Sequence, residues 1–337
     1  MINEISRPVV EQNSFFIKGK FDQFNRNIPY SAILDAFQEL LDFLLANNQE
    51  FLSHWKTKIL AQVGENAQLL VDVLPSLELI IGPQPKVAQL PAAEALNRFN
   101  LVFQGFVKAF SSGPGALVLF FDDLQWADQA SLQLLEFLMG DKDKKHLLVI
   151  GSYRDNEVSA SHPLYRIIEE AAAKSNINRI LLGAIKPRDL KQLLSDTFNC
   201  APELTNELTE LIDKKTKRNP FFISEFIKTL YKKGLVFFDY HEHKWKWSIG
   251  QIEESNITEN VIELVTDLLL GLEKETRNLC ALAACIGNQF DLRTLAVVNQ
   301  KDAEATAQQL FQAIKEGVIV PLTENYKSVS NNPAQAE

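Results

Sequence analysis

Apolar residues recur along much of the chain at the spacing of an amphipathic helix. Ile33, Phe37 and Leu40 lie three or four positions apart, which predicts a helix over 31–46 with one apolar face. The same spacing predicts further helices over 50–62, 66–80, 92–111, 131–139 and 164–174.

Short apolar runs between these helices predict strands. Leu117–Phe121 and Leu147–Ile150 are apolar at every position, which is typical of a strand in a parallel sheet covered by helices on both faces. Phe15–Ile17 is a shorter run of this kind, and Ile180–Leu182 is a weaker one. Because strands and helices alternate along the chain, the sequence predicts a doubly wound α/β domain.

After Pro187 the strand pattern stops and helical patterns dominate. Asn219 can cap the start of a helix and Pro220 suits its first position, so we expect a helix over 219–234. Residues 235–249 alternate in the manner of a β-hairpin. Further helices are predicted over 258–272, 275–286 and 302–316.

The composition narrows the classes of function. The chain has 337 residues, and its net charge of −9 argues against general nucleic-acid binding and against attraction to anionic membranes. Its three cysteines have no metal-binding or redox spacing, which favours a reducing, cytoplasmic setting. The start of the sequence lacks the features of a signal peptide, and no apolar run approaches the roughly 20 residues that cross a bilayer.

Two carboxylates stand where the Leu117–Phe121 strand ends. Asp122 follows the apolar run directly, and ligands of open parallel sheets bind beyond the carboxyl ends of the strands. A carboxylate there suits Mg²⁺ shared with substrate phosphates, and Asp123 is placed to orient an attacking water. The alternative is that both acids only end a strand and begin a turn. Asp128 is interpreted as the cap of the following helix.

A similar change from apolar to polar residues follows Leu147–Ile150. If the two strands are neighbours, Arg154 reaches the same crevice as Asp122, where a guanidinium can hold a phosphate through two hydrogen bonds. An ordinary surface pair with Asp155 or Glu157 explains the arginine equally well, so both interpretations stay open.

The glycine-rich phosphate-binding pattern G-x-x-x-x-G-K-S/T does not occur in the sequence. Gly19–Lys20 is followed by Phe21, and the glycines at 113 and 115 precede a strand instead of opening a helix. The backbone cradle and the lysine that such a loop offers to the β- and γ-phosphates are therefore missing from these residues.

Several segments occur together in an order that resembles a known family. They are Phe16–Tyr30, Phe121–Asp128, Gly151–Glu157, Asn219–Phe222 and Ala283–Asp291. Together they resemble the AAA-type, origin-recognition-like ATPase domain of signal-transduction ATPases with numerous domains (the STAND class). The version most similar to these segments occurs inside large bacterial, especially cyanobacterial, multidomain serine/threonine and histidine sensor kinases.

The resemblance implies a P-loop-NTPase-like fold with ATP and Mg²⁺ as cofactors. It implies that Asp122 is the Walker B carboxylate that holds magnesium, that Asp123 is its catalytic neighbour and that Arg154 is the sensor residue. It places Asn219 and Pro220 in a lid motif near the adenine. It divides the chain into an α/β core over 1–185, a helical lid over 186–234, a hairpin with a winged-helix-like domain over 235–325 and a disordered tail over 326–337.

Two departures from the family bear on function. Arg218 stands where the lid motif usually has glycine, and the Walker A loop that normally precedes a segment similar to 2–8 is missing, as if the chain were a truncated fragment. We expect an ATP-binding switch module with weak or no hydrolysis of its own, whose partners are nucleotide and kinase or sensor domains. The alternative is a non-catalytic regulatory or protein-interaction fragment of a split sensor kinase.

Overall fold

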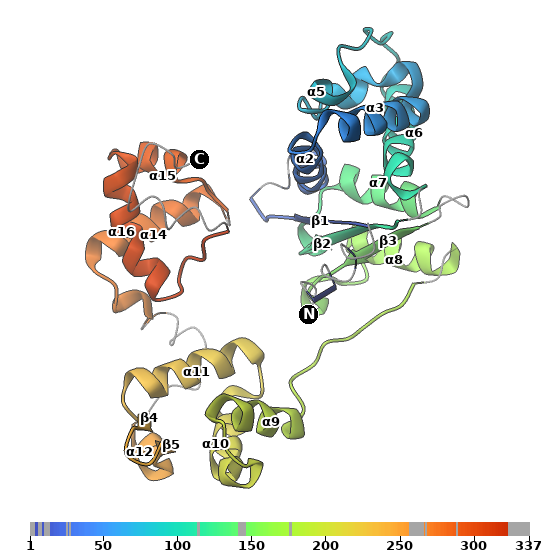
Figure 1. Cartoon of the computed structure of the whole chain (residues 1–337). Helices are drawn as coiled ribbons and strands as arrows, with labels where there is room; N and C mark the ends of the chain where they lie inside the picture. Colours follow the sequence, from blue (N-terminus) through green and yellow to red (C-terminus); the bar gives the residue numbers. More distant parts are fainter. Residues whose placement is uncertain are drawn as a thin grey trace. The chain divides into compact units, whose positions relative to one another are not determined.

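A computed structural model of the chain is shown in Figure 1. It describes residues 4–5, 9, 14–24, 26, 28–112, 115–140, 146–174, 177–255, 266, 268–287 and 289–322. Contacts divide the chain into two compact units, Met1–Asn178 and Arg179–Glu337, and each unit is described by itself.

The first unit is built on a parallel sheet of three described strands, β1 (Phe15–Lys20), β2 (Leu117–Asp122) and β3 (Leu147–Gly151). Their order in the sheet is β1-β2-β3, and both neighbouring pairs are parallel. β2 lies between the other two and is buried along most of its length, as its continuous apolar sequence predicts. The predicted α/β fold with a parallel sheet and flanking helices is confirmed.

Seven α-helices of the first unit have their bounds within the described part of the chain. They are α2 (Ser31–Leu45), α3 (Gln49–Val63), α4 (Gln68–Val71), α5 (Leu77–Ile81), α6 (Ala92–Ser111), α7 (Gln129–Gly140) and α8 (Pro163–Lys174). One apolar core joins them to the strands, with the fully buried rings of Phe37, Phe103 and Phe106 packed edge-on or tilted against one another.

A close approach between β1 and α2 fixes the edge of this core. A Cβ atom on Gly19 would lie 2.1 Å from the backbone oxygen of Ala32 in α2, so only glycine fits there without a shift of backbone. The glycine therefore allows α2 to pack directly on the last residues of β1, next to Lys20.

The second unit contains two separate apolar clusters. The first joins α9 (Pro187–Phe198), α10 (Asn206–Thr216) and α11 (Pro220–Lys232) to an antiparallel hairpin. The hairpin strands are β4 (Val236–Asp239) and β5 (Lys244–Trp247), followed by α12 (Ile249–Glu254). The second cluster joins α14 (Lys274–Ile286), α15 (Leu292–Asn299) and α16 (Ala303–Lys315).

Two predictions of secondary structure are wrong. Ile180–Leu182 is not a strand: the three side chains are 77%, 83% and 68% exposed, and the segment has no strand partner among the described residues. The single helix expected over 66–80 is interrupted at 72–76, because Pro75 lacks an amide hydrogen and disfavours helical backbone in Leu74. A separate prediction, that helices cover both faces of the Leu147–Ile150 strand, is wrong at Leu148, whose side chain is half exposed.

Other expectations lie partly outside the described residues. The predicted tail over 326–337 and most of the helix expected over 258–272 lie outside the described residues. The predicted division into core, lid, winged-helix-like domain and tail stays a prediction, although the boundary between the two compact units, at Asn178, is close to the end expected for the core.

Candidate functional site

The carboxyl ends of all three parallel strands carry polar side chains that meet at one edge of the sheet. Lys20 at the end of β1 is in register with Asp122 at the end of β2. Phe121 is in register with Gly151 at the end of β3, so the segments that carry Asp122 and Arg154 follow neighbouring strands, which was the condition of the hypothesis. We call the side chains of Lys20, Asp122, Asp123 and Arg154 together the strand-end site.

Asp122 is bonded across the strands. Its Oδ1 atom accepts hydrogen bonds from the Ser152 hydroxyl and, at 3.1 Å, from the backbone N–H of Asp123. Ser152 also donates its own N–H to the Phe121 oxygen at 2.9 Å, which continues the sheet one residue beyond β3. The aspartate is thus half buried and fixed, with Ser152 as a partner that the sequence did not single out.

Asp123 is the centre of the charges at this edge. Its backbone is left-handed (φ 54°), a conformation that Asp tolerates better than most residues, and its side chain is 13% exposed. Its carboxylate lies 3.4 Å from Lys20 Nζ and 3.9 Å from Arg154 Nε, and it accepts a hydrogen bond of 2.9 Å from Gln125 Nε2. Residues from both flanking strands therefore converge on one carboxylate.

Arg154 has two acidic partners. One supports its predicted place in the crevice beside Asp122, and the other supports the alternative of a surface ion pair. Its Nε atom faces Asp123, as stated above, while Nη1 is 3.0 Å from Glu157 Oε1 in a surface pair. The guanidinium carbon lies 5.4 Å from the centroid of the Trp126 ring, a cation–π distance. With 58% of its side chain exposed, Arg154 keeps access to solvent while its position is constrained.

Gln125 and His162 form a second layer behind these charges. Gln125 is 2% exposed, and its backbone oxygen receives His162 Nε2 at 3.1 Å and Arg26 Nη2 at 3.5 Å. His162 Nδ1 accepts the N–H of Leu164 at 3.1 Å at the start of α8, so its Nε2 carries the proton that binds Gln125. Sequence reasoning missed these residues, because a buried amide and a histidine 37 positions away give no periodic signal.

Capping explains Asp128 and Asn219. Asp128 Oδ1 accepts the N–H of Ser131 at 2.9 Å in the first turn of α7, which confirms the predicted cap. Asn219 Oδ1 accepts the N–H of Phe222 at 3.2 Å, and Pro220 is the first residue of α11. Asn219 and Pro220 belong to the second unit, so their predicted place near an adenine stays a prediction.

Arg218, where the resemblance predicts a glycine, has a left-handed backbone (φ 60°). This conformation is the physical reason for a glycine at such a position. Arg218 is held there by its N–H bond of 3.2 Å to Thr216 Oγ1 and by an ion pair of 3.1 Å with Asp213.

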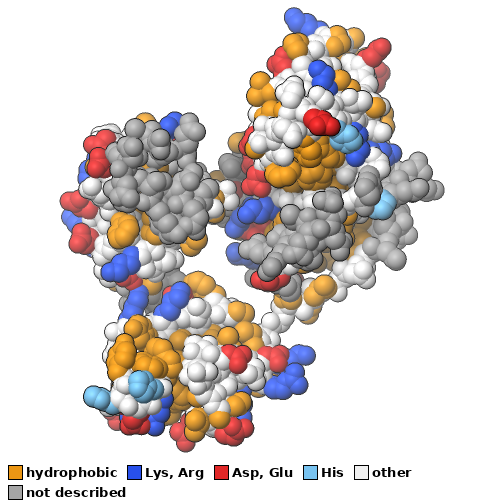
Figure 2. Space-filling view, viewed as in Figure 1, with side chains coloured by type: hydrophobic (Ala, Val, Ile, Leu, Met, Phe, Trp, Pro, Cys, Tyr) orange, Lys and Arg blue, Asp and Glu red, His pale blue; other side chains and the backbone are white. Residues whose placement is uncertain are grey.

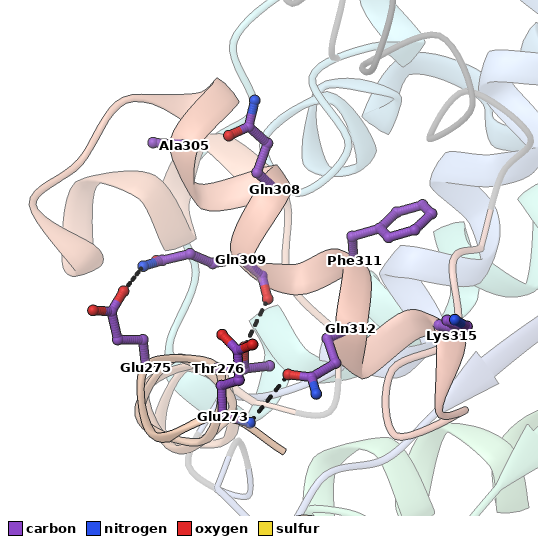
Figure 3. Close-up of a pocket in the computed structure, with 9 residues that line it drawn as sticks. All are labelled: Glu273, Glu275, Thr276, Ala305, Gln308, Gln309, Phe311, Gln312 and Lys315. Atoms are coloured by element: carbon purple, nitrogen blue, oxygen red, sulfur yellow. Dashed lines mark hydrogen bonds between the residues drawn. The ribbon is translucent and has the colours of Figure 1, made fainter.

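The second unit also holds a recess of about 600 Å³ between α14 and α16 (Figure 3). Its wall is crossed by contacts between the two helices: Gln309 Nε2 donates to Glu275 at 2.9 Å, and Thr276 Oγ1 donates to the backbone oxygen of Gln309 at 3.2 Å. The side chain of Phe311, 62% exposed, lies at its rim. These polar groups mainly join the two helices, so we assign no ligand to the recess.

The donor set of the strand-end site fits a magnesium ion only in part. Within the described residues no group of three or more His, Cys, Asp and Glu side chains is arranged to hold a metal. Two carboxylates at one sheet edge suit a hard cation whose remaining ligands are water and phosphate oxygens. The chain's own residues thus match a shared site better than an all-protein cage.

Comparison with known proteins places this geometry in a context. Residues 1–150 match the family described as the AAA ATPase domain. The hybrid signal transduction histidine kinase G of Dictyostelium discoideum is 29% identical over 90% of this chain and 10% of its own length. Histidine protein kinase 1 of Candida albicans is 19% identical over 97% of this chain and 16% of its own length. The chain therefore spans a small part of these relatives, and the matches together support an ATPase-like module of a signalling protein.

Solved structures of RuvB variants from Thermotoga maritima are also similar. One is 17% identical, with a TM-score of 0.29 over 62% of this chain and 67% of the RuvB chain. Another is 16% identical, with a TM-score of 0.27 over 83% and 89% of the two chains. The finer resemblance, to the STAND class of cyanobacterial kinases, stays a prediction.

Two further observations concern the charges on the surface and the apolar character of the helices. Acidic and basic side chains are interspersed on the visible face of both units (Figure 2). No helix within the described ranges has both the length and the apolar character needed to span a bilayer. The predicted cytoplasmic location stays a prediction.

Proposed function

We propose that this chain is a nucleotide-linked switch module of a signalling protein and that its ligand is ATP with Mg²⁺. The observation that carries the proposal is the convergence of Lys20, Asp122, Asp123 and Arg154 at the carboxyl ends of three parallel strands. Ligands of open parallel sheets bind at this edge. The match of residues 1–150 to an AAA ATPase domain supports the same conclusion.

Each residue has a role in this proposal. Asp122 would hold Mg²⁺ directly or through water, and Asp123 would orient or polarise the attacking water. Arg154 would contact the γ-phosphate, for which its exposed guanidinium is suitably placed. Asn219 and Pro220, at the start of α11, would belong to a lid near the adenine.

We expect weak binding and negligible hydrolysis by these residues alone. The sequence contains no G-x-x-x-x-G-K-S/T loop, so the backbone N–H groups and the lysine that usually bind β- and γ-phosphates are not supplied by it. The functional output is instead a nucleotide-dependent bias between domain arrangements, with kinase or sensor domains as partners.

Nucleotide-dependent stabilisation tests the proposal. A ligand that binds only the folded state stabilises it by RT ln(1 + [L]/Kd), so a ligand with a millimolar Kd raises the melting temperature when it is present at several times its Kd. We expect Mg-ATP at several millimolar to stabilise the chain and ATP with excess EDTA to do so much less. Asp122→Asn should remove the magnesium-dependent part of the stabilisation.

The control is Asp302→Asn, which keeps the cap of α16 and belongs to the second unit, so it is not one of the residues of the strand-end site. Equal stabilisation of the Asp122→Asn variant and the parent would contradict the assignment of magnesium to Asp122. Micromolar affinity for Mg-ATP would contradict the expected weakness of binding.

One observation favours a second candidate, a non-catalytic regulatory or protein-interaction module. Asp123 is engaged by Lys20, Gln125 and Arg154 together, which leaves its carboxylate few free directions for a water molecule. Under this alternative, Mg-ATP has no effect on stability, while a kinase or sensor domain of the same system binds the chain.

A further inference from the structure

We infer that Gln125 is a positioning residue that fixes Asp123 relative to Arg154 across the ends of β2 and β3. The amide uses both of its ends for this purpose. Its Nε2 atom donates to Asp123 Oδ1 at 2.9 Å, and its Oε1 atom accepts the backbone N–H of Arg154 at 3.2 Å. One side chain thus holds a carboxylate that follows β2 and the backbone of a residue that follows β3.

Burial makes this connection selective. Gln125 is 2% exposed, so a polar group placed there without partners would lose its hydrogen bonds to water without replacement. The other partners of Asp123 lie farther away, at 3.4 Å for Lys20 Nζ and 3.9 Å for Arg154 Nε. Both are ion pairs with long, partly exposed side chains, whereas the amide is buried and at hydrogen-bond distance.

The backbone around Gln125 is itself held by hydrogen bonds to the end of β3 and to the start of α8. Gln125 is the middle residue of the short 3₁₀ helix Leu124–Trp126, in which the N–H of Leu124 donates to the Ser152 oxygen at 2.9 Å. The backbone oxygen of Gln125 receives His162 Nε2 at 3.1 Å, from the start of α8. The amide therefore projects from a support that is already attached to β3 and to α8, and its direction is determined.

The chemistry requires a neutral amide at this position. Asp123 needs a donor and the N–H of Arg154 needs an acceptor, and glutamine offers one of each on one side chain. A glutamate would still accept from Arg154, but it would bring a second buried carboxylate next to Asp123. An aliphatic side chain would leave both partners without the amide.

The inference depends on the proposed function for one consequence, the effect of Gln125 on Mg-ATP binding. Its structural part can be tested without nucleotide, by comparing Gln125→Glu with the double variant Gln125→Glu/Asp123→Asn. The double variant exchanges amide and carboxylate: the new asparagine donates, the new glutamate accepts from Arg154, and the left-handed backbone at 123 tolerates asparagine.

The measurement is the urea midpoint of each protein at pH 7. Gln125→Glu should lower the midpoint, because two like charges then lie side by side and Asp123 loses the amide donor. The double variant should recover most of the midpoint at pH 7. If Gln125→Glu does not fold at pH 7, the recovery of folding in the double variant gives the same answer.

Gln192→Glu is the matched control. Gln192 also donates to a carboxylate, that of Asp196 at 2.8 Å, but the pair is exposed on α9 and joins nothing across a sheet. Its midpoint should change little. A Gln125→Glu variant that behaves like this control, or a double variant no more stable than Gln125→Glu, would overturn the inference.

Mg-ATP binding is measured on the same proteins. Gln125→Glu should weaken it at least about threefold, because Arg154 is then no longer held in place to contact the γ-phosphate. Recovery of stability without Mg-ATP binding by the parent would leave the positioning role intact and reject the proposed function. Unchanged Mg-ATP affinity in Gln125→Glu would reject the link between Gln125 and the site.

Discussion

The strand-end site of the first unit and the helix starts of the second unit use the same kinds of polar residue in different ways. In the first unit, Asp122 and Asp123 bind partners from other strands, such as Ser152 and Lys20. In the second unit, Asn219, Asp291 and Asp302 each accept an N–H from the third residue after them, at the start of their own helix.

This difference separates local from long-range roles. A helix cap satisfies a backbone donor within one turn and needs no other part of the fold. The strand-end site needs the whole parallel sheet, because Lys20 and Asp123 are far apart in sequence and meet only through strand register. We therefore expect changes that disturb the sheet to have large effects in the first unit and changes at caps to have small, local effects in the second.

The largest effect is expected for Gly19→Ala. The added Cβ would lie 2.1 Å from the oxygen of Ala32, and backbone atoms must move to accept it. We expect a loss of about 3 kcal/mol or more in the stability of the first unit, from overpacking of β1 against α2. Urea unfolding gives the free energy, and hydrogen exchange should place the loss in the first unit.

Gly140→Ala is the matched control, because nothing lies within 4 Å of an added Cβ at the end of α7. This change should be neutral or stabilise by roughly 0.5 kcal/mol, as alanine favours helix. Similar effects of the two changes would contradict the close packing of β1 against α2. They would also contradict the idea that this packing holds Lys20, at the end of β1, in place.

An intermediate effect is expected for Asn219→Ala. The change removes the acceptor for the Phe222 N–H at the start of α11 and should cost about 1 kcal/mol. Ser248→Ala is the control, since Ser248 precedes α12 without making a side-chain cap bond, and it should have almost no effect. Hydrogen exchange in the first turns of α11 and α12 measures both. Equal protection loss in the two helices would argue against the cap.

The smallest effect is a pH dependence at α15. Hydrogen bonds from the side chain and then the backbone of Thr294 hold the pKa of Asp291 below its usual value. A carboxyl with a lowered folded-state pKa contributes stability above its unfolded pKa of about 3.9, and this contribution is lost as the pH falls through the folded pKa. Because the group is exposed, we expect less than about 0.5 kcal/mol.

Asp291→Asn keeps an acceptor for the Thr294 N–H but cannot titrate, so the acid-dependent loss should disappear in this variant. Hydrogen exchange of α15 measured from pH 5 to pH 2.5 compares the two proteins. An identical acid response in both would contradict the role of Asp291.

Much of the fold was accessible from sequence because its signals are local. The continuous apolar runs of β2 and β3 and the helical spacing of α2 and α6 were interpreted correctly. Ile180–Leu182 was misleading, because the formation of a strand depends on a partner as well as on apolar residues. The interruption at Pro75 was overlooked, although its cause is visible in the sequence.

The candidate site was accessible only in outline. Asp122, Asp123 and Arg154 could be chosen because each follows an apolar run at a strand end. Selecting the polar residue at the end of each predicted strand would also have given Lys20. The apolar run Phe15–Ile17 predicts the strand β1, and Lys20 is the last residue of that strand. Gln125 and His162 could not be found in this way, because their roles depend on burial and on contacts between separated segments.

The contacts that Gln125 makes with Asp123 and Arg154 have a consequence for how these positions evolve. Lys20, Asp123, Gln125 and Arg154 come from three stretches of sequence, yet each contributes to one electrostatic balance. A substitution in one stretch alters what the other two must supply, so these four positions should drift together as lineages diverge. A recombination event that exchanged one stretch alone would bring together charges selected for different neighbours.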